Sequence, residues 1–355
     1  MKILSFGAGA IGTYIGGSLA LAGNKVVFVE QLDAAELLRQ KGLKLNLALD
    51  SRRTGETEFS LASPAVEFAV SLKEALSFGP FDVAIFALKS YDTAAALEGM
   101  SLFVNELPPL LCLQNGVDNE PAIAKLLGQS RVIAGTVTSA IGRRSIGDII
   151  LEKLRGVGVA DGHPLSRQLV NVFNEAHLHA RLFPKAADMK WSKMLTNLLS
   201  NPTSAILDMT AAEVFSNEDL YRLEIDQLKE CLAVMRAQRI GVVDLPGTPV
   251  RALAFATQLP VWLSKPFLSK AAGAGRGAKM PSFHIDLYSG RGRSEISYLH
   301  GAVVRAGEKY GIPTPVNSLL TETLLELTSG KLPLSEFAKK PDKFLQRLPI
   351  ESRYD

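Results

Sequence analysis

The feature that most constrains this chain is a glycine-rich turn between a short apolar strand and a helix. Residues 2–6 (KILSF) are predicted to form a strand, residues 7–12 read GAGAIG, and residues 13–23 have the pattern of a helix. A second strand, rich in β-branched residues, follows at 25–30. Strand, Gly-x-Gly-x-x-Gly, helix and strand in this order predict a βαβ unit that binds a dinucleotide.

Each glycine of this turn has a physical role in binding a pyrophosphate. Gly7 permits the tight turn, Gly9 lets the backbone approach the phosphates, and Gly12 allows close packing of helix on strand. The N-terminus of the helix adds N–H donors and a partial positive charge. The alternative is a turn with a purely structural role. We expect coenzyme contacts from Gly7, Ala8, Gly9, Ala10, Ile11 and Gly12.

An acidic residue at the end of the second strand bears on the choice of coenzyme. Glu30 lies 18 residues after Gly12. A carboxylate at this place usually accepts a hydrogen bond from the ribose 2′-hydroxyl and repels a 2′-phosphate, which favours NADH over NADPH. The alternative is that Glu30 faces solvent while Arg39 or Lys41 contacts the phosphate of NADPH.

Three further apolar runs predict buried strands of the same parallel sheet. They cover residues 82–88, 109–114 and 131–140. Lys89 follows the first run and Asn115 follows the second. Ligands of open α/β sheets bind at the carboxyl ends of strands, so both residues lie where a ligand is expected. The alternative for Asn115 and the glycine after it is a plain turn.

From about residue 185 the pattern changes from strands to amphipathic helices. The helical periods cover residues 218–241, 295–311 and 314–330. A chain of 355 residues is long enough for two domains with separate cores. We predict an α/β Rossmann-type domain with a doubly wound parallel sheet at 1–184 and an all-α substrate and dimerisation domain at 185–355.

A segment rich in glycine and basic residues interrupts the helical half. We expect residues 245–281 to form a long loop that leads towards Ser282. Two interpretations of its last part, residues 264–282, stay open. It is either a mobile lid whose positive charges attract an anionic substrate or an ordinary solvated insertion. Its basic residues are Lys265, Lys270, Arg276 and Lys279.

The stretch WSKMLTNLLSNP, residues 191–202, reads as a helix with a polar row beside its apolar stripe. Lys193, Asn197 and Asn201 recur every four residues, so on a continuous helix they share one face. A solvated helix face is the simplest interpretation. Against it, asparagine is a poor helix former and the flanking residues are apolar.

The composition excludes several other classes of protein. The net charge is +3, which is too small to indicate a nucleic-acid partner. The two cysteines, Cys112 and Cys231, form neither a metal-binding spacing nor a disulfide framework and indicate a reducing compartment. The N-terminal apolar run is too short for a secretory signal, and no run is long enough to span a membrane. We expect a cytoplasmic protein that binds no metal.

Together the motifs resemble those of the ketopantoate reductase (2-dehydropantoate 2-reductase) family over nearly the full length. The glycine motif is shared with many unrelated enzymes, whereas the lysine–asparagine–asparagine helix and a late glutamate are specific. The resemblance rests on GAGAIG (7–12), FALKSYDT (86–93), LQNGVDNE (113–120), GTVTSA (135–140), WSKMLTNLLSNP (191–202) and SEISYLHGAVVRAGEKYGIPTPVN (294–317).

The resemblance implies an enzyme that reduces a 2-oxo acid with NADPH or NADH, foremost 2-dehydropantoate to pantoate in pantothenate and coenzyme A biosynthesis. Lys193 matches the catalytic lysine, and Glu295 matches the glutamate that holds the substrate hydroxyl and the nicotinamide ribose. Lys89 matches a coenzyme-binding lysine, and Asn115 matches the asparagine between coenzyme and substrate. The other matched substrate-binding positions are Asn197, Asn201 and Ser282.

The chain also departs from the family pattern. Glu30 and Gln31 stand where members often carry a basic residue that binds a 2′-phosphate, and Ala211 stands where a further asparagine is expected. The coenzyme and the particular oxo acid therefore stay open. Two other interpretations also stay open, a dehydrogenase of similar architecture acting on a 3-hydroxy acid and a non-catalytic regulator that senses the dinucleotide. A homodimer through the helical half is expected by analogy only.

A lysine and two asparagines in a row suit the reduction of a ketone. A hydride that arrives at the carbon leaves negative charge on the oxygen, and a protonated amine beside it stabilises that charge and supplies the proton. Asparagine side chains orient the substrate with neutral donors, so they add no charge near the lysine. A single rigid helix is expected to hold all three groups in place.

Overall fold

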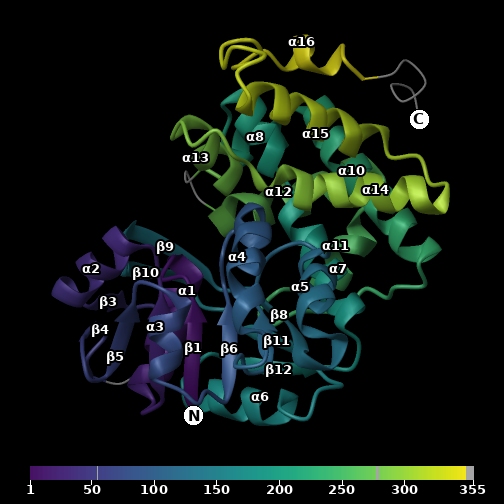
Figure 1. Ribbon diagram of the computed structural model, residues 1–355. Helices are drawn as coiled ribbons and strands as arrows, with labels where there is room; N and C mark the ends of the chain where they lie inside the picture. Colours follow the sequence, from purple (N-terminus) through teal and green to yellow (C-terminus); the bar gives the residue numbers. More distant parts are fainter. Residues whose placement is uncertain (54, 277–279, 349–355) are drawn as a thin grey trace. The chain divides into compact units, whose positions relative to one another are not determined.

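The computed structural model describes residues 1–53, 55–276 and 280–348, which belong to two compact units (Figure 1). The first unit comprises Met1–Lys190 and Leu245–Thr248, and the second comprises Trp191–Asp244 and Pro249–Asp355. Within the described residues, no helix is both long and apolar enough to cross a membrane.

The described part of the first unit contains an eight-stranded sheet in the order β12-β11-β8-β7-β6-β1-β2-β5. The chain order reverses between β1 and β6, as in a Rossmann-type sheet. The predicted fold class is therefore confirmed for this unit. The strands are β1 (Lys2–Phe6), β2 (Lys25–Val29), β5 (Val66–Ala69), β6 (Val83–Phe86), β7 (Leu110–Cys112), β8 (Val132–Val137), β11 (Val157–Ala160) and β12 (Ala180–Phe183).

The sheet differs from the prediction in one respect, because β11 runs antiparallel to β8 while the other neighbours are parallel. Between these two strands the chain forms a hairpin rather than a crossover helix, so it returns in the opposite direction. The hairpin belongs to a second sheet, of order β4-β3-β10-β9, which was not predicted. Its strands are β3 (Leu43–Asn46), β4 (Glu58–Leu61), β9 (Ala140–Ser145) and β10 (Asp148–Lys153).

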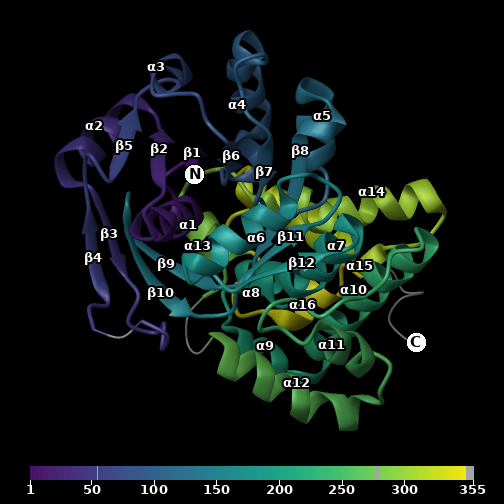
Figure 2. The same cartoon turned by 90° about the horizontal axis from the view of Figure 1, so that it is seen from below.

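Helices cover both faces of the large sheet (Figure 2). Alternate residues of β1 face the two sides, since Ile3 belongs to one buried cluster and Leu4 and Phe6 belong to another. The first cluster is completed by α1 and α6 and the second by α3, α4 and α5. The helices of this unit are α1 (Ala10–Leu21), α2 (Leu32–Lys41), α3 (Leu72–Ser77), α4 (Thr93–Met100), α5 (Asn119–Leu127) and α6 (Ser166–Glu175), with short 3₁₀ turns η1 (Ser90–Asp92), η2 (Ser101–Phe103) and η3 (Gln129–Arg131).

Every element named in the described part of the second unit is helical, as predicted. One helix, α7, begins in the first unit and continues into the second. The elements are α7 (Ala186–Leu198), α8 (Asn201–Leu207), α9 (Ala211–Ser216), α10 (Glu218–Ala237), α11 (Val250–Ala256), α12 (Val261–Arg276), α13 (Ser282–Tyr288), η4 (Glu295–Tyr298), α14 (His300–Tyr310), α15 (Pro315–Thr328) and α16 (Pro341–Leu345).

The expected long loop at 245–281 is wrong over most of its length, because α11 and α12 occupy it. Ser264 and Leu268 are one helical turn apart and both are buried, and the Tyr221 hydroxyl donates to Ser264 Oγ at 2.7 Å. This buried face outweighs the local signal from the glycines. Lys279 lies outside the described residues, as do the side chains of Lys270 and Arg276, so the lid hypothesis has no structural test there.

A buried histidine at the start of α14 makes the stability of the protein depend on pH. His300 is fully buried, and its Nε2 lies 2.9 Å from Gln227 Oε1. Burial lowers the pKa of His300 to about 3, from 6.5. The folded state therefore keeps this ring neutral where the unfolded chain takes up a proton. The stability that it contributes is present above pH 6.5 and is lost as the pH falls towards about 3.

We expect the free energy of unfolding to fall by up to about 1.4 kcal/mol per pH unit from this group across that interval. His300→Gln keeps an N–H donor towards Gln227 without a titrating ring, so its stability should fall less steeply with acid. Urea unfolding of both proteins at a series of pH values measures the difference. Equal slopes would contradict the assignment.

Candidate active site

The candidate coenzyme residues of the first unit gather at one edge of the large sheet. Phe6 of β1 is paired with Val29 of β2 and with Phe86 of β6, and Phe86 is paired with Cys112 of β7. The glycine turn and Glu30 directly follow β1 and β2. Lys89 and Asn115 each lie three residues beyond the paired strand ends. The carboxyl ends of four adjacent strands thus present every candidate residue of this unit at the point where the strand order reverses.

The backbone of the glycine turn requires glycine at two of its three glycine positions. Gly7 has φ +93°, a value that side chains disfavour, and a Cβ on Gly12 would lie 1.9 Å from Gly7 O. Gly12 is therefore required by the close approach of α1 to the turn. A Cβ on Gly9, in contrast, would meet no atom within 4 Å. The packing of the protein itself does not explain that glycine, whereas a phosphate lying against the turn does.

Glu30 is directed at the glycine turn rather than into solvent. Its Oε1 accepts a hydrogen bond from the backbone N–H of Ala8. Of the two basic residues that were alternative partners of a 2′-phosphate, Arg39 is engaged elsewhere, whereas Lys41 is exposed. Arg39 donates through Nε to Phe68 O at 2.9 Å and forms an ion pair with Glu74 at 2.5 Å. The charged side chain that contacts the glycine turn is thus the carboxylate of Glu30 and not the guanidinium of Arg39.

The loops that carry Lys89 and Asn115 are joined by buried polar side chains. Asn115 O accepts hydrogen bonds from Ser90 Oγ at 3.1 Å and from Asn119 Nδ2 at 2.7 Å. Gln114 Nε2 donates to Leu88 O at 3.1 Å. Because Ser90 and Asn119 are almost fully buried, these bonds are shielded from water and fix the two loops relative to each other. Sequence analysis did not identify this cluster.

A second lysine, which sequence analysis also missed, binds the backbone next to Asn115. Lys190 is 6% exposed, and its Nζ donates to Gln114 O at 2.7 Å and to Gly135 O at 3.2 Å. It also forms an ion pair of 2.6 Å with Glu120. Burial alone lowers the pKa of this amine, but the Glu120 carboxylate raises it above its usual value. The signal was present in the sequence, since Lys190 stands between the apolar Met189 and Trp191.

The predicted single helix with three polar residues on one face is wrong. Lys193 and Asn197 lie one turn apart on α7, both half-buried, but α7 ends at Leu198. Ser200 then adopts a left-handed conformation with φ +51°, and Asn201 begins α8. Pro202 explains the break, because proline has no N–H and its ring clashes with the preceding turn of a helix.

The break nevertheless leaves Asn201 in contact with Asn197 and Ser282, the other candidate substrate-binding asparagine and serine of the second unit. Its Nδ2 donates to Asn197 O at 3.3 Å, and its Oδ1 accepts from Phe283 N at 3.1 Å. Ser282 Oγ lies 3.4 Å from the same oxygen. These bonds join the end of α7 to the start of α13, and Asn201 is only 5% exposed. Asn197, Asn201 and Ser282 form one cluster, which we name the amide cluster.

Glu295 comes from a separate element of the second unit. It is the first residue of η4 and is 5% exposed. The turn is capped by Ser294, whose Oγ accepts from Ile296 N at 3.2 Å. The predicted helix over 295–311 is thus divided into η4 and α14, and Gly311 ends α14 with φ +68° as expected. A buried carboxyl group at such a position is costly unless it is hydrogen-bonded.

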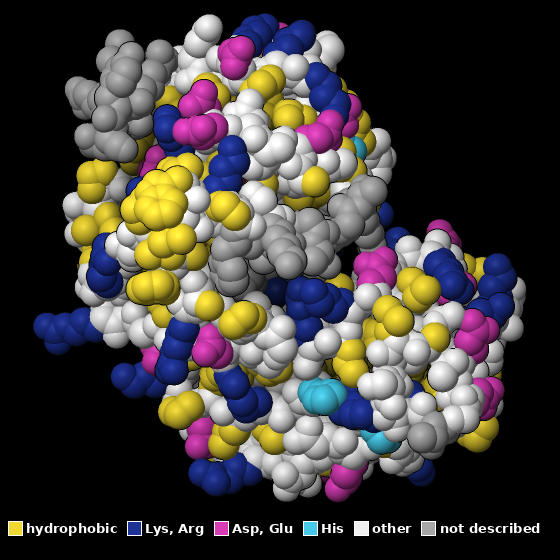
Figure 3. All heavy atoms as spheres, turned by 180° about the vertical axis from the view of Figure 1, so that it is seen from behind, with side chains coloured by type: hydrophobic (Ala, Val, Ile, Leu, Met, Phe, Trp, Pro, Cys, Tyr) yellow, Lys and Arg dark blue, Asp and Glu magenta, His cyan; other side chains and the backbone are white. Residues whose placement is uncertain are grey.

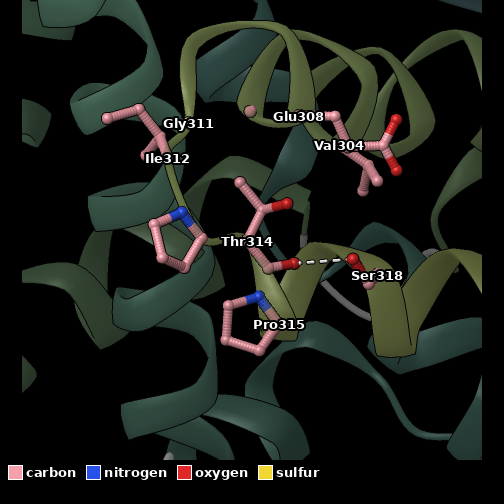
Figure 4. Close-up of a pocket in the computed structure, with 9 residues that line it drawn as sticks. Val304, Glu308, Gly311, Ile312, Thr314, Pro315 and Ser318 are labelled. Atoms are coloured by element: carbon pink, nitrogen blue, oxygen red, sulfur yellow. Dashed lines mark hydrogen bonds between the residues drawn. The ribbon is translucent and has the colours of Figure 1, made fainter.

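One pocket of the described residues is formed by other residues of the second unit. A pocket between the end of α14 and the start of α15 is lined by Glu308, Thr314 and Ser318 among others, and Ser318 Oγ donates to Thr314 O at 2.8 Å (Figure 4). It contains none of the candidate residues. On the face drawn in Figure 3, basic and acidic side chains are scattered among each other, as expected from the small net charge.

Comparison with known proteins places the chain among oxo-acid reductases. The model of the family described as ketopantoate reductase PanE/ApbA matches residues 3–160, and the model of its C-terminal part matches residues 185–328. The 2-dehydropantoate 2-reductase of Streptococcus pyogenes is 24% identical over 327 residues, which cover 91% of this chain and 96% of that protein.

Solved structures give the same fold. A PanE/ApbA family ketopantoate reductase from Ralstonia eutropha JMP134 has a TM-score of 0.76 at 24% identity, over 93% of this chain and 99% of that chain. A D-mandelate dehydrogenase in a ternary structure with NADH and anilino(oxo)acetate has a TM-score of 0.73 at 22% identity, over the same fractions of the two chains.

Proposed function

Because the chain belongs to the ketopantoate reductase family, we propose that it reduces 2-dehydropantoate to pantoate, with NADH as the preferred coenzyme. Its class is that of the NAD(P)-dependent oxidoreductases, which sets the interpretation as a non-catalytic regulator aside. The observation that supports the proposal most is that a chain matched by both family models also carries, on α7, the side chains that the reaction needs. Lys193 lies one turn before Asn197, and Asn197 is bonded through Asn201 to Ser282.

Each candidate residue of the second unit has a role that follows from its chemistry. The bound coenzyme supplies a hydride to the ketone carbon. Lys193 stabilises the negative charge that develops on the oxygen and donates the proton that completes the hydroxyl group. Glu295 accepts a hydrogen bond from a substrate hydroxyl.

The amide cluster orients the substrate carboxylate. Asn197 offers a neutral donor for it, and Ser282 offers another once its hydroxyl turns from Asn201 Oδ1 to the substrate. Asn201 has committed its carbonyl oxygen to Phe283 and Ser282 and one N–H to Asn197 O, which leaves the second N–H of its amide for the substrate.

The first unit supplies the coenzyme contacts of the proposal. The turn at 7–12 and the N-terminus of α1 hold the pyrophosphate, and Glu30 holds the adenine ribose. Lys89 contributes a positive charge beside the turn. Asn115 lies between coenzyme and substrate, and the buried bonds to its backbone keep it in place.

A substrate panel tests the activity. Purified protein is mixed with NADH or NADPH and with 2-oxo acids that carry branched, linear or aryl side chains, and with one 3-oxo acid, while coenzyme oxidation is followed. The highest kcat/KM is expected for 2-dehydropantoate. A higher value for the 3-oxo acid would favour the alternative dehydrogenase, and no turnover with any 2-oxo acid would refute the proposal.

The coenzyme preference is tested at Glu30. Glu30→Arg removes a charge that repels a 2′-phosphate and adds one that binds it, so the ratio of kcat/KM for NADPH to that for NADH should rise by at least about tenfold, about 1.4 kcal/mol. Glu36→Arg makes the same change of charge on the exposed side of α2 and should leave the ratio close to that of the wild type. A wild-type protein that strongly prefers NADPH would show that Glu30 does not play this role.

A further inference from the structure

The break between α7 and α8 is energetically unfavourable on its own. Ser200 has φ +51°, and in a left-handed conformation the Cβ comes too close to the following carbonyl oxygen. Pro202 prevents the helix from continuing, but it does not determine the direction in which the chain leaves the break. That direction places Asn201, so the amide cluster depends on whatever holds Ser200.

A fully buried carboxyl group on α10 holds both sides of this break. Glu224 is 0% exposed, and its Oε2 accepts a hydrogen bond from Ser200 N at 2.6 Å. Its Oε1 accepts from the Thr203 hydroxyl. These two donors flank Asn201 and Pro202 in the sequence. The two bonds therefore fix the left-handed residue before Asn201 and the first turn of α8 after it.

The carboxyl group also accepts a hydrogen bond from a neutral amide, which in turn contacts a histidine. Gln227 Nε2 donates to Glu224 Oε2, and Gln227 Oε1 lies 2.9 Å from His300 Nε2. Gln227 Oε1 can only accept, so the His300 ring donates to it through Nε2–H, and burial, which lowers the pKa of this ring to about 3, keeps the ring neutral. Gln227 is thereby oriented with its N–H towards Glu224.

We propose that Glu224 is a positioning residue that acts through Ser200 to keep Asn201 aligned with Asn197 and Ser282. The role rests on the proposed function to the extent that the amide cluster binds the oxo acid. It requires an acceptor at Glu224 and not a charge. A glutamine would accept from Ser200 and Gln227 with its carbonyl oxygen and donate to the Thr203 hydroxyl with its amide, which preserves all three bonds.

Three variants separate this role from others. Glu224→Leu leaves Ser200 N without its acceptor, and the KM for the oxo acid should rise at least about tenfold while the Kd of the coenzyme stays within about twofold. Glu224→Gln should stay within about threefold of the wild-type KM. Adding Ser200→Gly to Glu224→Leu should recover most of the loss, because glycine adopts the left-handed conformation without a steric penalty. Glu218→Gln, on the exposed first turn of α10, is the control.

A measurement that is independent of activity keeps the inference separate from the proposed function. Amide hydrogen exchange at Ser200 should be slow in the wild type and in Glu224→Gln, and faster in Glu224→Leu. If the wild type reduced no 2-oxo acid, the proposed function would fail while this measurement would still test the positioning role. If Glu224→Leu does not fold, Thr203→Val removes one bond only and should raise KM and Ser200 exchange in the same direction by less. Unchanged KM and exchange in the variant that folds, or a double variant with no recovery, would overturn the inference.

Discussion

Replacing Lys193 by alanine is expected to lower kcat for the oxo acid by at least about a hundredfold, which is the usual loss when a general acid is removed. The Kd of the coenzyme should change little, because we assign the phosphates to the turn of residues 7–12 in the first unit. Steady-state kinetics and coenzyme titration on the same preparation measure both quantities. A kcat within about threefold of the wild type would show that another group protonates the oxygen.

Lys190 provides a contrast on the same helix. Its amine is taken up by Gln114 O, Gly135 O and the Glu120 carboxylate, so it has no proton to give to a substrate. Lys190→Met leaves Glu120 without its partner in a largely buried position, and the loss should appear as a lower Tm. If both lysine variants lost only stability, the distinction between a catalytic and a structural lysine on α7 would not hold.

The parts of the fold that the sequence predicted best depend on neighbours in the chain. The strand before Gly7, the turn and α1 follow from local rules, and Gly7 and Gly12 meet the constraints that those rules describe. Lys89 and Asn115 were found because strand ends can be read from apolar runs. What made these loops rigid, the contacts of Ser90 and Asn119, depends on residues of separate strands and could not be read from spacing.

The break at Ser200 depends on one local feature, which the sequence analysis missed, and on one long-range contact, which it could not predict. Pro202 was visible in the sequence, and proline has no N–H to bond the carbonyl group four residues earlier, so the end of α7 was predictable. The acceptor that stabilises the break was not, because Glu224 lies on another helix, 24 residues further along. Similarly, α12 exists because Ser264 and Leu268 are buried against other helices, which outweighs the glycines that suggested a loop.

Substitutions in the glycine turn are expected to have the second large effect, on coenzyme binding. Gly12 and Gly9 are required for different reasons, so their alanine variants should differ in stability. Gly12→Ala would place a Cβ 1.9 Å from Gly7 O, so the backbone must move. We expect a lower Tm together with loss of coenzyme binding. Thermal unfolding without coenzyme measures the first of these and coenzyme titration the second.

Gly9→Ala, in contrast, is expected to leave the fold intact and to raise the Kd of the coenzyme at least about tenfold. A Cβ there meets no protein atom within 4 Å, so the apoprotein accommodates it, but the methyl group occupies the space that we assign to the pyrophosphate. Gly99→Ala is the matched control, since a Cβ on this helical residue of α4 also meets nothing within 4 Å and lies away from the turn. Its Tm should be equal to or slightly above that of the wild type, because alanine stabilises a helix relative to glycine. Equal coenzyme affinity in the Gly9 and Gly99 variants would mean that the open space at Gly9 is not where the phosphates bind.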